Sequence, residues 1–281
     1  MNASSPRETA AAIRWRAELA GWQIPESILA SAPESPYGFP AAMFRADRES
    51  PANPSRDRAL QALPEGGTVL DIGCGGGRAS MALVPPAGRV VGVDSAAEML
   101  SSFAHEADLR QVNHSEIHGS WPQVSTSADA ADVVIAHHVI YNVPDLIEFA
   151  TALARAARHR VVLELTDTHP WVPTNDLWRI FHGLDRPAGP TAALAADVLR
   201  SCGVPVQVQS WQRPARPASR EQAVSFIRRR LCLPVAREGE VDAALATDYQ
   251  FAERGVTTLW WDYAASSDPD SRAPRRGRTG P

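Results

Sequence analysis

Residues 68–94 of the chain read TVLDIGCGGGRASMALVPPAGRVVGVD. The order predicts a buried strand over 69–72, a glycine-rich turn, a short helix over 78–84 that Pro85 stops, and a second strand over 90–93. Glycines in such a turn let backbone N–H groups approach a ligand. The carboxylate of Asp94, at the end of the second strand, can accept hydrogen bonds from two ribose hydroxyls. The stretch therefore predicts a βαβ unit that binds an adenosine cofactor.

The glycine spacing discriminates between two kinds of adenosine cofactor. A dinucleotide site needs a third glycine at position 78, counting from Gly73, and that position is Arg78. Here glycines stand at 73 and 75–77, and an acid, Asp71, precedes them. This acid–glycine pattern resembles the first motif of the Rossmann-like (class I) S-adenosylmethionine-dependent methyltransferases. With the loop His-His-Val-Ile-Tyr-Asn-Val-Pro at 137–144, the resemblance is to the small-molecule type, and it covers residues 58–263. It implies S-adenosylmethionine as the cofactor.

Strands and helices alternate along the rest of the chain, which favours an α/β, doubly wound parallel sheet. Further strands are expected at 116–118, 132–136, 161–165, 204–208 and 256–262, and further helices at 8–19, 95–107, 191–201 and after Val143. Ser95 and Glu98 are expected to form a capping box. Arg155, Arg158 and Arg160 are expected at the end of the helix after Val143. The resemblance implies a mostly parallel seven-stranded sheet with an antiparallel last strand.

The chain divides into three expected parts. Residues 1–57 form an N-terminal helical and proline-rich cap, in which Trp15, Leu19 and Trp22 share one helix face. Tyr37, Phe39, Met43 and Phe44 either cover the binding face or pack into the core. Residues 58–265 form the S-adenosylmethionine-binding domain, with inserts at about 170–190 and 214–255. Residues 266–281 have the composition of a disordered tail.

Composition excludes several functions. The chain has 281 residues and a net charge of -4, and all 28 of its basic residues are arginines. Without lysine it has neither a Walker-type phosphate lysine nor a Schiff-base lysine. The acidic balance offers no basic footprint for nucleic acid, so the Arg228-Arg229-Arg230 run is interpreted as a solvated helix face, with an acidic small substrate as the alternative.

Cysteine usage and hydropathy indicate the compartment. Cys74, Cys202 and Cys232 have neither metal-ligand nor redox spacing, which favours a reducing cytoplasm. No signal core or apolar run of membrane-spanning length is visible in the sequence. We therefore expect a cytoplasmic protein without a metal site and without a membrane partner. The sequence does not indicate its oligomeric state.

The resemblance also implies which residues bind the cofactor. The candidates follow the carboxyl ends of the first four strands: Asp71, Gly73, Cys74, Gly75, Asp94, Ser95, Ser120, Trp121 and His137. Gly73, Cys74 and Gly75 would contact the methionine part, and Asp71 would anchor the loop. Many relatives carry an acid where this chain has Ser120. Ser120 would then meet the adenine amino group, and Trp121 would either stack on adenine or pack into the core.

Three histidines are candidate general bases. His137 and His138 follow the fourth strand, and His169 follows the fifth. Histidine titrates near neutral pH, so each can take a proton from an acceptor. Glu164 lies inside the fifth strand, where an ionised acid needs a partner, so we expect it to pair rather than to catalyse.

The resemblance implies methyl transfer to an oxygen, nitrogen or carbon nucleophile of a small molecule. Two alternatives remain open at this stage. One is an NAD(P)-dependent oxidoreductase that uses the same glycine loop. The other is a non-catalytic protein that binds the cofactor.

Overall fold

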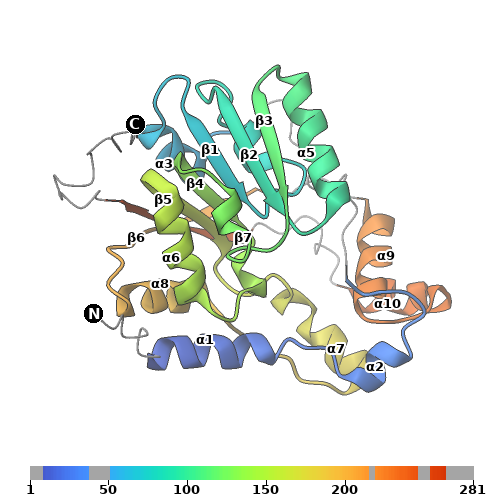
Figure 1. Cartoon of the computed structure of the whole chain (residues 1–281). Coiled ribbons are helices and arrows are strands. Elements are labelled where there is room, and N and C mark those ends of the chain that lie inside the picture. The colour runs from blue at the N-terminus through green and yellow to red at the C-terminus, as the bar shows by residue number, and fades with distance from the viewer. Residues whose placement is uncertain (1–8, 38–50, 215–218, 246–253, 264–281) are drawn as a thin grey trace, which may run out of the picture.

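The computed structural model describes residues 9–37, 51–214, 219–245 and 254–263. One sheet with helices on both sides dominates it (Figure 1). Its strands are β1 (Thr68–Ile72), β2 (Arg89–Asp94), β3 (Asn113–His118), β4 (Ala131–His137), β5 (Ala157–Thr166), β6 (Gln207–Arg213) and β7 (Arg254–Asp262). The helices are α1 (Ala10–Ala20), α2 (Glu26–Ala30), α3 (Pro54–Ala62), α4 (Arg78–Met81), α5 (Ala97–Leu109), α6 (Leu146–Ala156), α7 (Asn175–His182), α8 (Ala192–Ser201), α9 (Arg220–Arg230) and α10 (Glu238–Ala244).

The sheet is doubly wound, as predicted. Its seven strands lie in the order β3-β2-β1-β4-β5-β7-β6. Strands β1 to β5 pair in parallel, and β7 pairs antiparallel with both β5 and β6. The chain reverses its direction of winding between β1 and β4, and in such sheets ligands bind outside the carboxyl ends of the strands at that point. The topology therefore predicts a ligand site formed by the loops after β1, β2 and β4.

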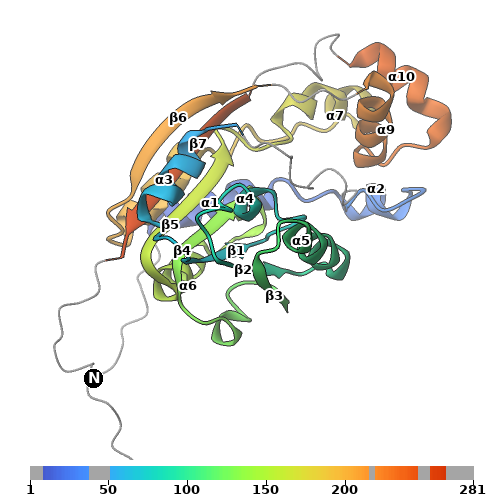
Figure 2. The same cartoon turned by 90° about the horizontal axis from the view of Figure 1, so that it is seen from above.

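Two helical layers cover the sheet (Figure 2). Helices α1, α6 and α8 pack on one face, in a core cluster that includes Trp15, Leu153 and Leu199. Helices α3, α4 and α5 pack on the other, in a cluster that includes Phe103 and Trp260. The continuous apolar runs of the central strands are explained by this burial on both faces.

The predicted face of α1 is confirmed. Trp15, Leu19 and Trp22 are all buried, and the Trp15 indole Nε1 donates a hydrogen bond of 2.8 Å to the Val143 carbonyl. The first helix therefore rests on the loop that follows β4. Tyr37 is half exposed, whereas Phe39, Met43, Phe44 and the tail 266–281 lie outside the described residues.

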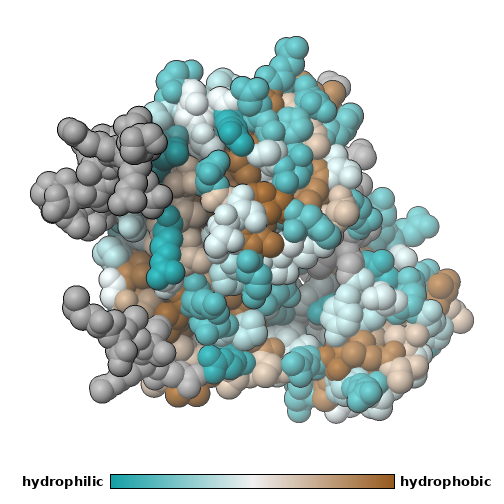
Figure 3. Space-filling view, in the orientation of Figure 1, coloured by the Kyte–Doolittle hydropathy of each residue, from teal (hydrophilic) through white to brown (hydrophobic). Residues whose placement is uncertain are grey.

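Helices α2, α7, α9 and α10 form a helical lobe beside the sheet, visible in both ribbon views (Figures 1 and 2). Its own apolar cluster includes Ile24, Trp178 and Ile227. Helices α7, α9 and α10 fall within the segments that the sequence marks as inserts. Figure 3 shows apolar side chains among polar ones on the outside of this lobe, where Ile180 and Val235 are exposed large apolar residues. No helix of the described residues is long and apolar enough to cross a membrane.

Two sequence expectations about helix and strand boundaries were wrong. Helix α6 ends at Ala156 and β5 begins at once, so Arg158 and Arg160 belong to the strand. Arg160 of β5 pairs with Asp262 of β7 at 2.6 Å. Its charge therefore stabilises a contact between neighbouring strands and does not interact with a helix dipole. Strand β6 begins at Gln207, because residues 204–206 complete the turn after α8: the Val204 amide bonds back to the Leu199 carbonyl.

The capping box expected from Ser95 and Glu98 is also absent. Helix α5 has Ala96 at its N-cap, without a side-chain capping bond. Asp94 binds the backbone there instead, since its Oδ1 accepts from the Ala96 amide at 2.9 Å. Asp94 thus binds the amide of the N-cap residue itself, whereas a serine cap would accept from an amide inside the first turn.

Candidate active site

The glycine loop closes over the ends of β1 and β2. The amides of Gly73 and Cys74 both donate to the Val93 carbonyl, at 2.7 and 3.0 Å. Gly73 has φ +67°, and a side chain there would overlap Val139 in the loop after β4. Glycine is needed at this position for both reasons. The loops after β1 and β4 are therefore in direct contact.

Asp94 joins this loop to the start of α5. Its Oδ2 accepts from the Gly75 amide at 2.9 Å, and its Oδ1 accepts from the Ala96 amide at 2.9 Å. Each carboxylate oxygen has a second acceptor position, so two further donors can bind the same group. Ser95 is exposed beside it, and its carbonyl lies 3.0 Å from His118 Nε2. Asp94 thus has the location and the free acceptor capacity that a ribose diol requires.

Asp71 is buried beneath the loop. Its Oδ2 accepts from the Ser80 hydroxyl of α4 at 2.8 Å. Burial raises the pKa of Asp71 to about 6, although the nearby His137 and the Ser80 hydrogen bond act in the opposite direction. Asp71 thus ties β1 to α4, on either side of the glycine loop.

Cys74 is buried as well, and its Sγ points toward β2. A side chain at Gly92 would lie 2.9 Å from that sulfur, so Gly92 leaves room for it. Burial raises the pKa of the Cys74 thiol, and the nearby Asp71 charge raises it further. The thiol therefore stays protonated and packs, and any cofactor contact from Cys74 must come from its backbone.

The two residues proposed for adenine lie in different environments. Ser120 is exposed after β3, whereas Trp121 is buried in the core cluster with α1 and α6. The Trp121 Nε1 finds no hydrogen-bond partner in the described parts of the chain. Ser120 remains accessible to a ligand, and the Trp121 ring packs in the interior.

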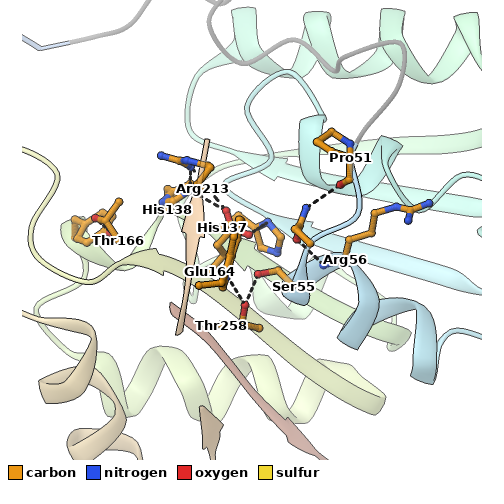
Figure 4. A network of polar contacts seen from close by, with 12 residues as sticks. Pro51, Ser55, Arg56, His137, His138, Glu164, Thr166, Arg213 and Thr258 are labelled. Atoms are coloured by element: carbon orange, nitrogen blue, oxygen red, sulfur yellow. Dashed lines mark hydrogen bonds and ion pairs between the residues drawn. The ribbon is translucent and has the colours of Figure 1, made fainter. Parts of the chain in front are cut away.

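His137 ends β4 and faces β5 (Figure 4). Its Nδ1 lies 3.9 Å from Glu164 Oε2, and its Nε2 is buried without a hydrogen-bond partner among the described residues. Burial lowers the pKa of His137, outweighing the opposite effects of Glu164 and Asp71. One polar nitrogen of the ring is therefore without a described partner.

His138 lies on the other side of the same carboxylate. Its φ of +60° is unusual for a residue other than glycine, and its amide donates to the Glu164 carbonyl at 2.7 Å. Its ring Nε2 lies 3.0 Å from Glu164 Oε1 and 2.7 Å from Nη1 of Arg213. Figure 4 shows the three side chains converging from the β4 loop, β5 and β6.

One nitrogen cannot serve both neighbours of His138. Arginine only donates and a carboxylate only accepts, so Nε2 either carries a proton and donates to Glu164 or lacks one and accepts from Arg213. In the first arrangement Nδ1 has the free lone pair, and in the second Nδ1 carries the proton. The cluster therefore offers two tautomers of His138 with opposite proton positions.

Glu164 pairs, as expected from its burial. Burial raises its pKa, but the charge of His137 and hydrogen bonds from His138 and Ser55 outweigh that effect, so the pKa of Glu164 is held below its usual range. Ser55, on α3, also shares a hydrogen bond of 2.7 Å with Thr258 of β7 (Figure 4). The carboxylate thus stays ionised and holds the two histidines.

His169 lies apart from this cluster. It is buried, stacked on Trp22 with ring centroids 3.9 Å apart, and meets the Tyr141 ring edge-on at 5.4 Å. Burial and the charges of Arg230 and Arg186 lower the pKa of His169 to about 3. Such a ring is a weak proton acceptor near neutral pH, which disfavours it as a general base.

Arg213, Ser55 and Tyr141 were not among the candidates from sequence. The Tyr141 hydroxyl shares a hydrogen bond of 2.7 Å with Thr166 Oγ1, which ties the loop after β4 to the end of β5. Tyr141 lies in the 137–144 stretch and could have been selected from it. Arg213 could not, because it reaches His138 only through the strand order that puts β6 at the edge of the sheet. No group of three or more potential ligand side chains within the described ranges is arranged to hold a metal.

Comparison with known proteins identifies the class. Residues 44–230 match a family model described as a methyltransferase domain, and the chain belongs to that family. The family confirms the expected S-adenosylmethionine-dependent methyltransferase class and its cofactor. The oxidoreductase alternative is not favoured.

Particular relatives match over part of the chain. Trans-aconitate 2-methyltransferase of Azoarcus sp. (strain BH72) is 41% identical over 103 residues, which is 34% of this chain and 36% of that protein. Ubiquinone biosynthesis O-methyltransferase of Hydrogenovibrio crunogenus is 30% identical over 95 residues, 34% of this chain and 39% of that protein. The chain thus spans little more than a third of the length of these curated relatives.

Solved structures support the fold. A Bacillus halodurans C-125 protein, named as a methyltransferase, superposes with a TM-score of 0.52 at 16% identity, covering 74% of this chain and 97% of its own. The YcgJ protein of Bacillus subtilis superposes with a TM-score of 0.50 at 20% identity, covering 74% and 97%. At these identities the likeness concerns the fold.

The residues at the switch point fit the cofactor. The turn has three glycines with positive φ, at 73, 75 and 77, which brings backbone rather than side chains to its surface. The Asp94 carboxylate has spare acceptor positions, and His137 has a buried nitrogen without a described partner. These are the donors and acceptors that an adenosine and its charged methionine part would use.

Proposed function

We propose that the chain transfers a methyl group from S-adenosylmethionine to an oxygen, nitrogen or carbon nucleophile of a small molecule. The observation that carries the proposal is the contact between Gly73 and Val139. It joins the cofactor loop after β1 to the loop after β4, which begins with the two histidines. A methyl donor on the first loop and a proton acceptor on the second would then lie in one site.

Each part of the proposed cofactor site has a physical role. The Asp94 carboxylate would hold the ribose hydroxyls, and the backbone of Gly73, Cys74 and Gly75 would line the methionine part. Ser95 and Ser120 remain proposals for the adenosine end, and the partnerless nitrogen of His137 for a contact in the middle. The buried Trp121 would support the site by packing rather than by stacking on adenine. When bound, the cofactor supplies an electrophilic methyl group on a positively charged sulfur. The protein contributes mainly alignment, which is worth roughly 7–11 kcal/mol of the barrier in the most favourable intramolecular reactions.

We propose His138 as the general base. With Nε2 donating to Glu164 at 3.0 Å, Nδ1 has a free lone pair that can take a proton from the acceptor. The ionised Glu164 would then stabilise the positive ring. The proton would move from the acceptor to Nδ1 while the acceptor's electron pair bonds the methyl carbon. The sulfur–methyl bond would break at the same time, leaving its electron pair on a neutral sulfur. Arg213 competes for Nε2 and would favour the inactive tautomer, so its position would decide how much base is available.

The acceptor is proposed from the surroundings of the site. One curated relative is named for trans-aconitate and the other for the biosynthesis of ubiquinone. Both names refer to small molecules, which supports a small-molecule acceptor. The net charge of -4 supports the absence of a nucleic-acid partner. The spacing of the three cysteines supports a cytoplasmic location. Domain boundaries at residues 57/58 and 265/266 remain part of the proposal.

A transfer assay tests the proposal. The protein is incubated with methyl-labelled S-adenosylmethionine and metabolite fractions from the source cell, and label is measured in small molecules. Label that appears with the wild type and disappears with Asp94→Asn supports the proposal. Tight binding of S-adenosylhomocysteine without transfer to any fraction would instead indicate a non-catalytic cofactor-binding protein.

A further inference from the structure

Two arginines face the inside of the helical lobe. Arg230 ends α9, and its guanidinium lies 4.6 Å from the ring centre of Trp171 and 5.3 Å from that of Tyr37. Arg186 follows α7 and lies 4.8 Å from the ring centre of Trp178 and 5.3 Å from that of Trp22. Aromatic rings thus enclose both cations, and both side chains are half-buried.

These two arginines differ in their partners from four other arginines of the lobe. Arg179, Arg220 and Arg237 pair with acids at 2.8, 2.6 and 2.7 Å. Arg228 is buried and pairs with Glu34 and Glu238. Within the described ranges, Arg230 and Arg186 have no acidic partner and bond only to backbone carbonyls.

Burial without a counter-charge has a cost at both residues. Burial lowers the pKa of Arg230 and of Arg186, and the charge of Arg186 acts in the same direction on Arg230. The Nε of Arg186 is a buried donor that lacks a hydrogen-bond partner in the described structure. A half-buried cation without a counter-charge loses part of its hydration, and a bound anion offsets that cost. The arrangement is therefore that of a receptor for negative charge.

The arginines lie on the acceptor side of the proposed active site. Arg186 lies over Trp22, which stacks on His169 at 3.9 Å. Arg230 lies over Trp171, whose amide donates to His169 Nδ1 at 3.3 Å. His169 in turn contacts Tyr141, which lies in the loop that begins with His137 and His138. A molecule bound at the arginines would extend from the lobe toward that loop.

We infer that the methyl acceptor carries an anionic oxygen group, a carboxylate or a phosphate, which Arg230 and Arg186 bind. A guanidinium presents a planar fork of donors that suits either group. An apolar part of the same molecule would lie beside Trp171 and Phe226, whose rings stack with centroids 5.5 Å apart next to Arg230. The anion anchors the acceptor and is not itself the proposed methylated group. This inference rests on the proposed function.

Binding of small probes tests the inference. Benzoate, phenyl phosphate and the neutral benzamide are titrated calorimetrically into the protein, with and without S-adenosylhomocysteine. We expect at least one anion to bind at least tenfold more tightly than benzamide, and the stronger of the two identifies the group. Arg230→Gln should weaken anion binding about tenfold or more, since a hydrogen bond to a charged group is lost. It should leave benzamide and S-adenosylhomocysteine binding unchanged.

Arg229→Gln, one residue away on α9, is the matched control and should bind the anions as the wild type does. Arg230→Lys keeps the charge without the fork and should fall between wild type and Arg230→Gln. The inference is overturned if benzamide binds as tightly as the anions, if no anion binds in the millimolar range, or if Arg230→Gln binds the anions normally. Failure to bind S-adenosylhomocysteine would contradict the proposed function instead, and the probe titrations made without it would still test the anion site.

Discussion

The His138 Nε2 lies 3.0 Å from Oε1 of Glu164, and the His138 amide donates to the carbonyl of the same residue at 2.7 Å. Two contacts, one from the ring and one from the backbone, therefore hold His138 against β5. The backbone contact accompanies a φ of +60°, which orients the residue away from the path of β4. The His138 side chain is therefore held in a defined position at the carboxyl ends of the strands.

Replacing His138 should affect turnover and leave cofactor binding intact. His138→Gln removes the proposed base, and we expect kcat to fall by about 10²–10⁴ because general-base catalysis contributes that much. The dissociation constant of S-adenosylhomocysteine should stay unchanged. His159→Gln is the control, since His159 lies near the start of β5, at the end of the strands opposite to the proposed site. Normal turnover of His138→Gln across the pH range would remove His138 from the mechanism.

Asp71 makes the stability of the ligand-free protein depend on pH. The ordinary pKa of its carboxyl group is 3.8, and burial in the folded protein raises this pKa to about 6. As pH rises between these values, the unfolded chain releases its proton first, so stability falls. The difference corresponds to about 3 kcal/mol, fully lost above the folded pKa. Asp71→Asn removes this dependence and can still accept from Ser80.

Urea unfolding at several pH values measures this effect. Relative to wild type, Asp71→Asn should gain stability from pH 4 to pH 7, while its affinity for S-adenosylhomocysteine stays the same or falls. A difference between the two proteins that does not change with pH would show that Asp71 titrates normally.

Gly73 and Gly183 give a matched pair of substitutions. Both have positive φ, but a side chain at Gly73 meets Val139, whereas one at Gly183 meets no atom within 4 Å. Gly183→Ala should cost about 1–2 kcal/mol of unfolding free energy from backbone strain alone. Gly73→Ala should cost more and should also abolish S-adenosylhomocysteine binding. Equal costs and normal cofactor binding in both variants would contradict the proposed contact between the two loops.

Two of the three consecutive arginines of α9, Arg228 and Arg229, should differ in their effect on stability. Arg228 is buried against Glu34 and Glu238, so Arg228→Gln should destabilise the protein by about 3 kcal/mol, at the low end because both acids are partly hydrated. Arg229 lies over Phe226 and should cost at most about 1 kcal/mol. Chemical denaturation compares them, and equal losses would argue against a specific role for Arg228. The sequence-based interpretation of this run as a solvated face was thus wrong for Arg228.

Much of the fold was predictable from local pattern. The βαβ unit at 68–94, the central strands and the buried face of α1 follow from apolar periodicity and from Pro and Gly positions. The boundary errors have local causes. Arg158 and Arg160 were assigned to a helix because basic residues favour helix ends, but α6 passes into β5 without a loop. The sequence pattern predicts a cap at Ser95, but Asp94 at the end of β2 accepts from the helix-start backbone instead, and a local helix pattern does not include that strand residue.

The candidate site was predictable only in part. Asp94, the glycines and the histidine pair stand at strand ends, where topology brings them together. Arg213 and Ser55 reach Glu164 from β6 and from α3, at sequence separations that no local pattern reveals. The burial of Trp121 likewise depends on α1 and α6, which lie elsewhere in the chain.

Cofactor selectivity tests the central claim most directly. S-adenosylhomocysteine, NAD and NADP are each titrated into the wild-type protein and into Asp94→Asn by calorimetry. We predict that S-adenosylhomocysteine binds the wild type, that neither dinucleotide does, and that Asp94→Asn weakens binding at least tenfold. Binding of NAD or NADP without binding of S-adenosylhomocysteine would contradict the account.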